Sequence, residues 1–292
     1  MSKIVLITIC VWSLVILLYM CICRQQQPKI NINPTVDVIC LVQNNSAYIQ
    51  YLRKLVPRIQ DKYPSDTLKF HFFENDSTDD TVAQLDQFVR EYKYATRYEL
   101  KVGLLNDFSK DWSKTDALKR LEYMVKIRQW CKEKLGRLKS DYTLTIDSQL
   151  IFTEDTIHQM IMTLRSNKQI GMVTPYTVAG DRQSGHYYDT LALQLNNGQQ
   201  TWPYCPFDEC TARWCKNLCE KHKCKKVRVG RKCLTVNLAF GGMSLVYTKW
   251  YNRCRYKLGP SDRTEHDSFT KQYKSISRKH VVIDPSIQLW MS

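Results

Sequence analysis

The sequence predicts an α/β fold, a mostly parallel β-sheet flanked by helices, preceded by one N-terminal transmembrane helix. Three observations support this prediction. Short apolar, β-branched runs alternate with helical periodicities along the chain, as in parallel sheets that helices cover. Polar clusters follow several of the predicted strands, as expected at the ligand-binding edge of such a sheet. An uncharged apolar run over residues 4–23 has the length that a helix needs to cross a bilayer.

We interpret the N-terminal run as an uncleaved signal anchor. A cleaved signal peptide has a shorter apolar core and a cleavage site of small residues, whereas this run ends in Cys-Ile-Cys-Arg, followed by Gln-Gln-Gln. We therefore expect a short cytosolic tail and anchor helix over 1–24, a stem over 25–35 and a luminal domain over 36–292. This organisation predicts a single-pass type II membrane protein of the Golgi or the endoplasmic reticulum.

The cysteines favour a luminal domain. Six of the nine cysteines beyond the apolar run lie between Cys205 and Cys233, in a basic insertion. This density predicts disulfides in an oxidising compartment. A zinc site could instead be drawn from Cys215, Cys219, His222 and Cys224. The paired C-x-x-C knuckles of strong zinc motifs are missing, which favours disulfides. Glycosylation sequons begin at Asn44 and Asn75 and also agree with a luminal glycoprotein.

The composition narrows the range of partners. Of 292 residues, 43% are hydrophobic and 24% are charged, which excludes a disordered or collagen-like chain. The net charge of +15 favours anionic partners such as nucleic acids, lipid headgroups or the phosphates of activated metabolites. Because the predicted anchor places the chain at a membrane, with its body in the lumen, we expect no nucleic-acid partner.

The predicted elements alternate from residue 36 to residue 175. Strands are predicted over 36–42, 68–73, 98–104, 142–146 and 170–175, and helices over 47–63, 78–94, 115–138 and 154–166. Within 47–63, for example, Tyr48, Leu52, Leu55 and Ile59 recur at helical spacing. The pattern weakens in the Cys-rich stretch and resumes over 234–247 and 280–290.

Three polar clusters follow predicted strands: Gln43-Asn44-Asn45, the acidic run from Glu74 to Asp80, and Asp147-Ser148-Gln149. Since the carboxyl ends of parallel strands share one edge, we expect all three to face one crevice. The run from Glu74 has two interpretations. Asp76 or Ser77 could be the N-cap of the next helix, with Asp79 and Asp80 complementing its dipole. Alternatively, these side chains hold the base or ribose of a nucleotide.

Acids and arginines near this edge suggest chemistry on a diphosphate. Asp147 leaves a buried strand and could hold Mg²⁺ or Mn²⁺ against a diphosphate leaving group, or could simply be a strand-end acid. Arg120 and Arg128 lie eight positions apart on the predicted helix, roughly on one face. They could reach the diphosphate or belong to a solvated basic face. Glu265-His266-Asp267 offers a metal ligand, a general base or a helix start.

Several short blocks stand in a recognisable order: FFENDSTDDT, KIRQW, YTLTIDSQLIF, GHYYDTLAL with NNG, AFGGMSLVY, TEH and VVIDPS. In this order they resemble the fungal capsule-associated α-1,3-mannosyltransferase family, type II membrane glycosyltransferases with a GT-A-like fold. The resemblance spans roughly residues 36–286. It implies transfer of a sugar, with mannose a candidate, from a nucleotide-sugar donor to a glycan or glycoprotein acceptor.

With this resemblance, the expected site has three groups of residues. Those expected at the nucleotide sugar are Asn44, Glu74, Asn75, Asp76, Ser77, Arg120, Arg128, Ser148, Gly241 and Gly242. Those expected at a divalent cation, Mn²⁺ or Mg²⁺, are Asp147, Gln149 and His266. Candidates for catalysis are Asp189, Glu265 and Asp267. Gln149 stands where a GT-A metal motif commonly has a second acid, which leaves a second hypothesis: a catalytically inactive, membrane-anchored GT-A-like protein that binds glycans.

Overall fold

The computed structural model describes residues 33–64, 67–100, 114–178, 187, 192–196, 232–259, 262 and 264–291. From Pro34 onward these residues belong to one compact unit. The predicted anchor, nearly all of the stem, most of the Cys-rich insertion and Asp189 lie outside the described residues. None of the helices within the described ranges combines the length and hydropathy that a bilayer span requires.

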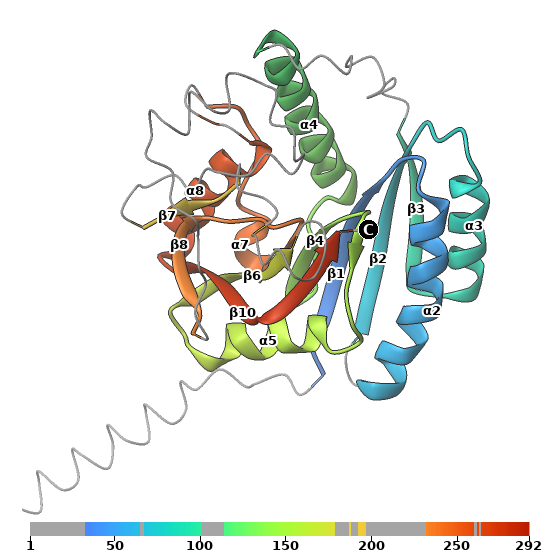
Figure 1. The fold of residues 1–292 in the computed structure, drawn as a ribbon, viewed down its shortest axis with the longest axis horizontal. Coiled ribbons are helices and arrows are strands. Elements are labelled where there is room, and N and C mark those ends of the chain that lie inside the picture. Colours follow the sequence, from blue (N-terminus) through green and yellow to red (C-terminus); the bar gives the residue numbers. More distant parts are fainter. Residues whose placement is uncertain are drawn as a thin grey trace, which may run out of the picture. The chain divides into compact units, whose positions relative to one another are not determined.

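Four neighbouring strands form the parallel half of the sheet (Figure 1). They are β1 (Thr35–Val42), β2 (Thr67–Asn75), β3 (Ala95–Leu100) and β4 (Tyr142–Asp147), in the order β3-β2-β1-β4. Leu41 pairs with Asp147, and Val42 with Glu74, so the carboxyl ends of β1, β2 and β4 lie level with one another. The predicted parallel arrangement and the shared edge are confirmed for this half.

The other half of the sheet is mixed, so the prediction of a mostly parallel sheet is wrong there. Its strands are β5 (Leu150–Ile151), β6 (Ile170–Val178), β7 (Gln194–Leu195), β8 (Leu234–Leu238), β9 (Met243–Tyr247) and β10 (His280–Met291). β9 runs antiparallel between β4 and β6, whereas β10 is parallel to β6 and antiparallel to β8. The stretch over 234–247, where the predicted pattern resumes, is divided by a turn at Gly241-Gly242, whose φ angles are +60° and +74°. This turn separates β8 from β9, which pairs antiparallel with β4.

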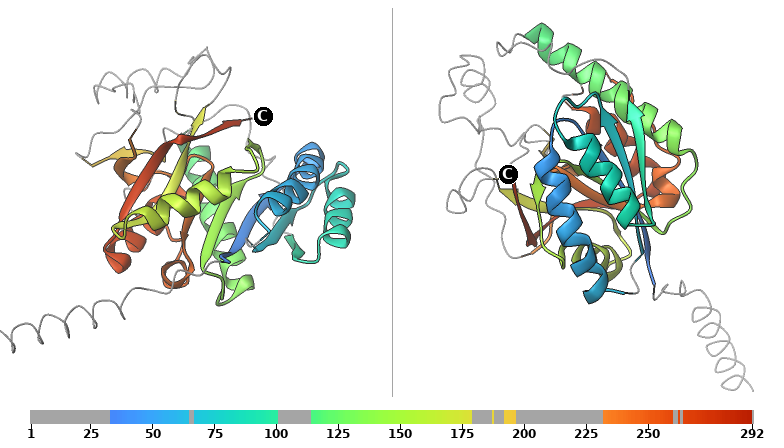
Figure 2. Two further views of the ribbon diagram at one scale, coloured as in Figure 1. Left: turned by 90° about the horizontal axis from the view of Figure 1, so that it is seen from below. Right: turned by 90° about the vertical axis from the view of Figure 1, so that its right-hand side faces the viewer.

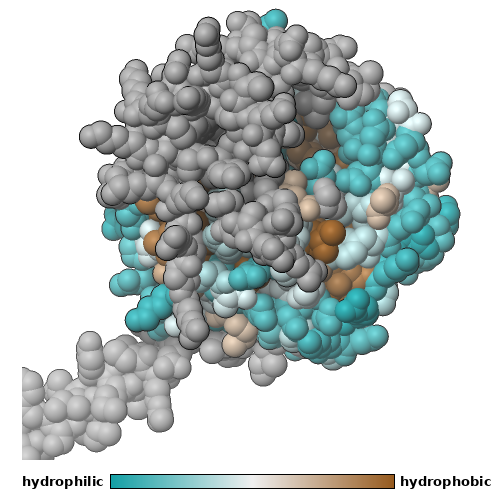
Figure 3. Space-filling model, viewed as in Figure 1, coloured by the Kyte–Doolittle hydropathy of each residue, from teal (hydrophilic) through white to brown (hydrophobic). Residues whose placement is uncertain are grey.

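Helices cover both faces of the sheet (Figures 1 and 2). They are α2 (Ser46–Lys62), α3 (Thr81–Glu91), α4 (Lys114–Leu135), α5 (Thr156–Ser166), α7 (Thr248–Tyr251) and α8 (Glu265–Ser277). Alternate residues of β1 enter two different cores, because successive side chains of a strand point to opposite faces. Val38 and Cys40 belong to the core under α2, α3 and α5, and Ile39 belongs to the core under α4 and α8. The side bearing α2 and α3 presents mainly hydrophilic residues (Figure 3).

The start of α3 differs from the sequence prediction. Its N-cap is Asp80, not Asp76 or Ser77, and the Asp80 side chain makes no capping hydrogen bond. Asp79 instead accepts a hydrogen bond from the Thr81 amide at 3.0 Å. Because the helix begins several residues after the strand ends, residues 76–78 are free of helical geometry and form a loop at the sheet edge.

Candidate active site

Two loops at the carboxyl edge of the sheet are joined into one wall. After β1, the Asn44 amide donates a hydrogen bond to Ser77 Oγ at 2.9 Å, and the Thr78 amide donates to Asn44 Oδ1 at 2.7 Å. The Ser77 amide donates to Glu74 Oε1 at 2.6 Å. Asn44 and Asp76 have φ angles of +46° and +48°, a left-handed conformation that Asn and Asp tolerate better than most residues. The sequence prediction that these clusters meet in space is confirmed.

Within this wall the side chains differ in accessibility. Glu74 and Asn75 are buried, whereas Asn44 is exposed and Asp76 and Ser77 are half-buried. Glu74 therefore shapes the loop through Ser77, and Asn44 and Asp76 are the residues that can contact a ligand. Asn75 is 5% exposed in the folded protein, which disfavours an N-linked glycan at that position.

Asn45 joins this wall to the loop after β4. Its amide donates to Thr81 Oγ1 at 2.7 Å, its Oδ1 accepts from the Tyr48 amide at 3.3 Å as the N-cap of α2, and its Nδ2 donates to the Ser148 carbonyl oxygen. The loop containing Ser148 and Asp147 is therefore held beside the start of α2. From the sequence, Asn45 was predicted to belong to a polar cluster, with no role of its own.

The Gly241-Gly242 turn lies against the end of β4. The Asp147 amide donates to the Gly242 carbonyl oxygen at 2.8 Å. Both glycines have positive φ, and a Cβ on Gly242 would lie 2.9 Å from Leu150 Cδ1, closer than real Cβ contacts allow. A Cβ on Gly241 would lie 2.6 Å from Tyr187 Oη. Only glycine fits here, so the turn brings bare backbone next to Asp147.

Arg128 of α4 is the centre of the buried part of the site. Its Nη2 donates to Asp147 Oδ1 at 3.1 Å, and its Nε donates to Glu265 Oε1 at 3.0 Å. The Arg128 side chain is only 5% exposed, compared with 36% for Asp147 and 16% for Glu265. The Phe240 ring lies 5.3 Å from the guanidinium carbon and stacks on His266 with 3.6 Å between ring centroids. One arginine thus holds together the end of β4 and the start of α8.

Arg128, Asp147, Glu265 and His266 form what we call the Arg128 cluster. The charges of these four side chains follow from burial and pairing. Burial would lower the pKa of Arg128, but Glu265 and Asp147 outweigh it and hold that pKa above its usual value. Burial would raise the pKa of Glu265, but His266 and Arg128 keep it well below its usual range. Desolvation raises the pKa of Asp147 in spite of Arg128 and His266. Burial and Arg128 lower the pKa of His266, which is therefore neutral at pH 7.

The comparisons with known proteins identify the family. The family model described as Cryptococcal mannosyltransferase 1 matches residues 39–277. The chain belongs to this family of glycosyltransferases. The match covers Asn44, Glu74, Arg128, Asp147, Gly242 and Glu265 of the site and agrees with the resemblance that the sequence blocks predicted. A search of curated protein sequences found no match.

Two solved structures are similar to this mannosyltransferase-family chain at low identity. GalNAc-T7, solved with UDP, GalNAc and Mn²⁺, is 9% identical, with a TM-score of 0.50 over 88% of this chain and 44% of its own. Mannosyltransferase PcManGT from Pyrobaculum calidifontis, solved with GDP-Man and Mn²⁺, is 13% identical, with a TM-score of 0.47 over 98% of this chain and 66% of its own. The chain therefore spans less than two thirds of the length of either structure. Likeness at this level concerns the GT-A-like fold alone.

Near Arg128, the carboxylate of Asp147 fits as a ligand of a divalent cation. No group of three Asp, Glu, His or Cys side chains in the described ranges is arranged to hold a metal ion. Asp147 is partly exposed, and in the described residues only its Oδ1 accepts a hydrogen bond. Mg²⁺ needs only one or two carboxylates when substrate phosphates and water complete its shell. His266 is buried against Phe240 and Gln149 is exposed, so neither joins Asp147 in a preformed metal cage.

Other predicted site residues lie elsewhere. Arg120 is exposed on α4, about 12 Å along the helix axis from Arg128. The prediction that the two arginines share a face is wrong, because eight residues turn a helix about 80° beyond two full turns. Asp267 is buried and accepts a hydrogen bond from Thr264 Oγ1 at 2.7 Å, which directs it to the start of α8. Phe240 was missed, because an apolar side chain before two glycines gives no sign in the sequence of a place in the site.

Proposed function

We propose that this protein transfers a mannosyl group from a nucleotide-linked donor to a hydroxyl group of a glycan or glycoprotein. Family membership supports the choice of mannose. The single observation that carries the proposal within this chain is the Arg128 cluster. It brings Asp147 and Glu265, which lie more than a hundred residues apart in sequence, to the crevice edge of the sheet. Coupled carboxylates beside a nucleotide-binding edge suit the departure of a nucleoside diphosphate.

The wall formed by the loops after β1 and β2 is proposed to bind the nucleoside. Asn44 and Asp76 offer amide and carboxylate groups at the surface of this wall, while Ser77, Thr78 and Glu74 fix their positions through the hydrogen bonds described above. Both residues hold left-handed backbone conformations that would otherwise be unfavourable. A preorganised wall of this kind reduces the ordering needed when the donor binds.

Asp147 is proposed to lie at the donor diphosphate. A divalent cation bound there would neutralise the charge that develops on the leaving diphosphate. Arg128 fixes the orientation of Asp147 through Oδ1 and leaves Oδ2 as the remaining acceptor. Because Arg128 is almost fully buried and bonded to two acids, we assign it the role of a positioning residue, not that of a direct diphosphate ligand.

Glu265 is proposed to orient a sugar hydroxyl. Its pKa is held low by His266 and Arg128 against the effect of burial, so it remains ionised and accepts hydrogen bonds. The same low pKa makes it a weak general base, since an efficient base has a pKa near the working pH. We therefore leave the base unassigned, and Asp189 stays a candidate outside the described residues.

The experiment measures nucleoside diphosphate release by the full chain with GDP-mannose and with other nucleotide sugars, in Mn²⁺, Mg²⁺ or chelator. We expect turnover with GDP-mannose, and a loss of roughly 100-fold or more in Asp147→Asn, since one catalytic electrostatic contact contributes about this much. Asp86→Asn is the matched control, because Asp86 is an exposed acid on α3 that pairs with Arg97. Binding of donors without turnover in any condition would instead support the inactive glycan-binding hypothesis.

We also propose that the chain is anchored in the membrane by residues 4–23, with the body in the lumen. The support is the apolar run itself. Protease treatment of intact and of opened microsomes tests the orientation: the body should be protected in intact vesicles and digested once they are opened. Digestion of the body in intact vesicles would place it on the cytosolic side.

A further inference from the structure

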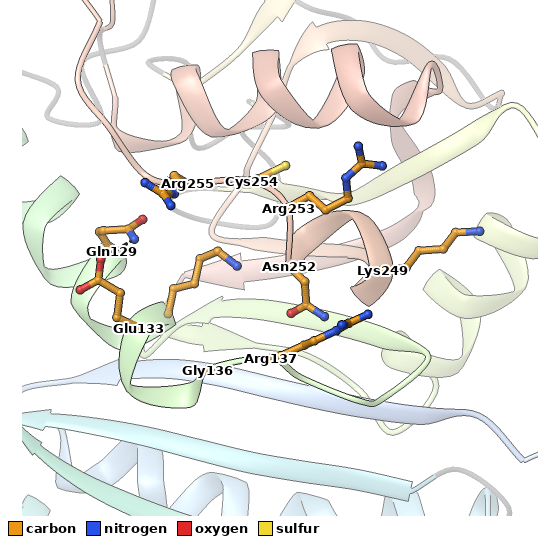
Figure 4. Close-up of a pocket in the computed structure, with 10 residues that line it drawn as sticks. Gln129, Glu133, Gly136, Arg137, Lys249, Asn252, Arg253, Cys254 and Arg255 are labelled. Carbon is orange, nitrogen blue, oxygen red and sulfur yellow. Dashed lines mark hydrogen bonds between the residues drawn. The ribbon is translucent and has the colours of Figure 1, made fainter.

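A second pocket lies away from the crevice, at the edge where β4 begins. It has a volume of about 570 Å³, within the range of small-ligand sites. Its lining comes from the end of α4 and the loop after it, and from α7 and the segment that follows (Figure 4). Five of the lining residues are cationic: Lys132, Arg137, Lys249, Arg253 and Arg255. Glu133 is the one acid among the described lining residues.

The positive charge of this pocket is not neutralised by acids of the described residues. Some cations elsewhere on the surface are paired, as in Arg53 with Glu91 and Arg58 with Glu154. In contrast, none of the five pocket cations forms an ion pair with an acid of the described ranges. Glu133 instead accepts a hydrogen bond from Gln129 at 2.8 Å. Like charges gathered around one cavity repel each other unless an anion occupies it.

Lys132 shows that the charge extends into the interior. It is 8% exposed, its Nζ donates to the Tyr251 carbonyl oxygen at 2.8 Å, and it lies 4.2 Å from the centroid of the Tyr251 ring. A buried ammonium group normally has a carboxylate partner. Here it has a carbonyl and an aromatic face, so it retains the capacity to bind an anion that enters the pocket.

The walls of the pocket are fixed by hydrogen bonds between its two sides. The Tyr256 amide donates to Gln129 Oε1 at 2.9 Å, which joins α4 to the segment after α7. Asn252 donates to the Leu138 carbonyl oxygen at 2.9 Å and accepts from the Leu138 amide at 3.2 Å. The cationic side chains therefore project from a rigid frame, which lowers the entropy lost when a ligand binds.

We propose that this pocket is a phosphate-binding site, distinct from the donor crevice, for a ligand that carries a phosphomonoester or a diphosphate group. Guanidinium groups match phosphate oxygens in forked geometry, and the pocket contains three arginines beside two lysines. Several cations suit a group of two or more negative charges better than a single carboxylate. The ligand source is either a soluble phosphate compound or a phospholipid headgroup, and both present the same chemistry.

The position of the pocket makes the second source worth testing. It lies at the same edge of the sheet as Thr35, the first residue of β1, whose amide donates to Asp141 Oδ2 at 2.9 Å. Asp141 directly precedes β4, and the Asp141 carbonyl oxygen accepts from the Thr248 amide at 3.1 Å, at the start of α7. The chain that leads from the predicted anchor therefore enters the body at the edge that bears the pocket.

The test uses the full chain in phosphatidylcholine nanodiscs, titrated with inorganic pyrophosphate by calorimetry in excess GDP. Wild type is compared with Arg137→Gln/Arg253→Gln, and with Lys54→Gln/Arg90→Gln as a control of equal charge change on α2 and α3. All four residues are exposed, so the fold should be kept, and circular dichroism checks this. We expect the pocket variant to bind pyrophosphate about tenfold more weakly or worse, and the control to bind like wild type. Equal affinities in the two variants would overturn the proposal, as would no binding by wild type.

A second arm distinguishes the two sources. The same titration is repeated in nanodiscs containing phosphatidylinositol 4-phosphate. If headgroups occupy the pocket, pyrophosphate affinity of wild type falls several-fold in these discs, and the pocket variant is insensitive to the lipid. If the pocket binds soluble ligands, the lipid leaves the pyrophosphate affinity of wild type unchanged. A loss of affinity that is equal in wild type and in the pocket variant has the same meaning, because it does not depend on the pocket. Each result supports the phosphate site and assigns its source, because the loss caused by the pocket substitutions is measured first.

Discussion

Arg128 holds two carboxylates from different elements, and its geometry matters as much as its charge. A guanidinium donates through several N–H groups in one plane, whereas a lysine offers a point charge. We expect Arg128→Lys to lower donor turnover roughly 100-fold and to destabilise the fold by about 1–3 kcal/mol, because one of Asp147 and Glu265 loses its partner. Turnover assays and urea denaturation measure the two effects.

Arg97→Lys is the matched control for Arg128→Lys. Arg97 pairs with Asp86 at 2.8 Å on the surface of the protein, where the two side chains are 25% and 43% exposed. Exposed pairs of this kind contribute about 0–1 kcal/mol. An Arg128→Lys variant with the turnover of wild type would contradict the positioning role.

Gly242 and Gly136 provide a matched pair of glycines with similar backbone angles. Their φ angles are +74° and +63°, but a Cβ would collide with Leu150 at Gly242 and would meet nothing within 4 Å at Gly136. We expect Gly136→Ala to destabilise by about 1 kcal/mol through its backbone alone. Gly242→Ala should cost about 2–4 kcal/mol and should also lower turnover, since Asp147 donates to the Gly242 carbonyl oxygen. Thermal denaturation and donor assays measure both; equal effects in the two variants would show that the collision is absorbed.

Individual residues were predictable where their chemistry was visible in the sequence. Asp147 and Glu265 stood out as acids at a predicted strand end and helix start. Arg128 stood out as a cation on the predicted helix before that strand, and the structure brings the three together. Phe240 has no such signature, because an apolar side chain before two glycines is indistinguishable from core until the fold is known. Arg120 was misplaced because the eight-residue spacing was treated as an exact number of helical turns.

At the scale of elements, α4 connects the crevice to the phosphate pocket. Arg128 and Lys132 are one helical turn apart on its buried side, and both are nearly inaccessible. Burial lowers the pKa of Lys132 to about 8, with Cys254 raising it slightly and Arg255 lowering it further. One face of a single helix therefore contributes cations to two sites. In the crevice, acids pair with the cation Arg128, whereas in the pocket Lys132 forms no ion pair with an acid of the described residues.

The low pKa of Lys132 predicts a specific dependence of stability on pH. Between about pH 8 and the ordinary lysine value of 10.5, the unfolded chain binds more protons than the folded one, so the free energy of unfolding rises with pH. Below about pH 8, both states are protonated and the burial penalty is constant. Lys132→Met removes this penalty. We therefore expect its gain in free energy of unfolding over wild type to be about 1–3 kcal/mol larger at pH 7 than at pH 10.

Urea denaturation of both proteins at pH 7 and pH 10 measures this difference. Lys126→Met, which removes an exposed lysine from the same helix, controls for the loss of one charge. A stability difference between Lys132→Met and wild type that stays constant from pH 7 to pH 10 would show that Lys132 does not titrate in this window.

Elements were predictable in the parallel half of the sheet and less so beyond it. Strands β1, β2 and β4 are short apolar runs bounded by polar clusters, and their alternation with helices determines the topology. The half that contains β6, β8, β9 and β10 depends on pairings between strands far apart in sequence, such as β4 with β9. Nothing local specifies such a pairing, so the direction of β9 could be known only from the fold.

At the scale of the whole molecule, the crevice and the phosphate pocket lie at opposite edges of one sheet. Asp147 ends β4 and Tyr142 begins it, so the two edges are separated by roughly 17 Å along this strand. Thr35, the first residue of β1, lies at the pocket edge. The donor crevice therefore lies at the opposite end of the strands from the point where the chain enters β1.

The compact unit that begins at Pro34 predicts where the body can be separated from the anchor. We expect a fragment starting at Asn33 to fold and to keep donor turnover within about threefold of the full chain, because Thr35 retains both of its hydrogen bonds to Asp141 Oδ2, at 2.9 and 3.1 Å. A fragment starting at Asp37 also loses Val36, which is fully buried. Burial of a valine contributes about 1.5–3 kcal/mol.

The shorter fragment loses both the burial of Val36 and the hydrogen bonds to Asp141. It should therefore melt about 10 °C lower than the longer one, since 1 kcal/mol shifts the melting temperature of a domain of this size by about 2–4 °C. Differential scanning fluorimetry compares the two fragments, and the donor assay compares each with the full chain. Asp141→Ala in the longer fragment removes the acceptor of both hydrogen bonds and so separates their contribution from that of Val36. A longer fragment that is folded but inactive would mean that residues before Asn33 take part in turnover, and equal melting temperatures would mean that the first two residues of β1 contribute little to the sheet.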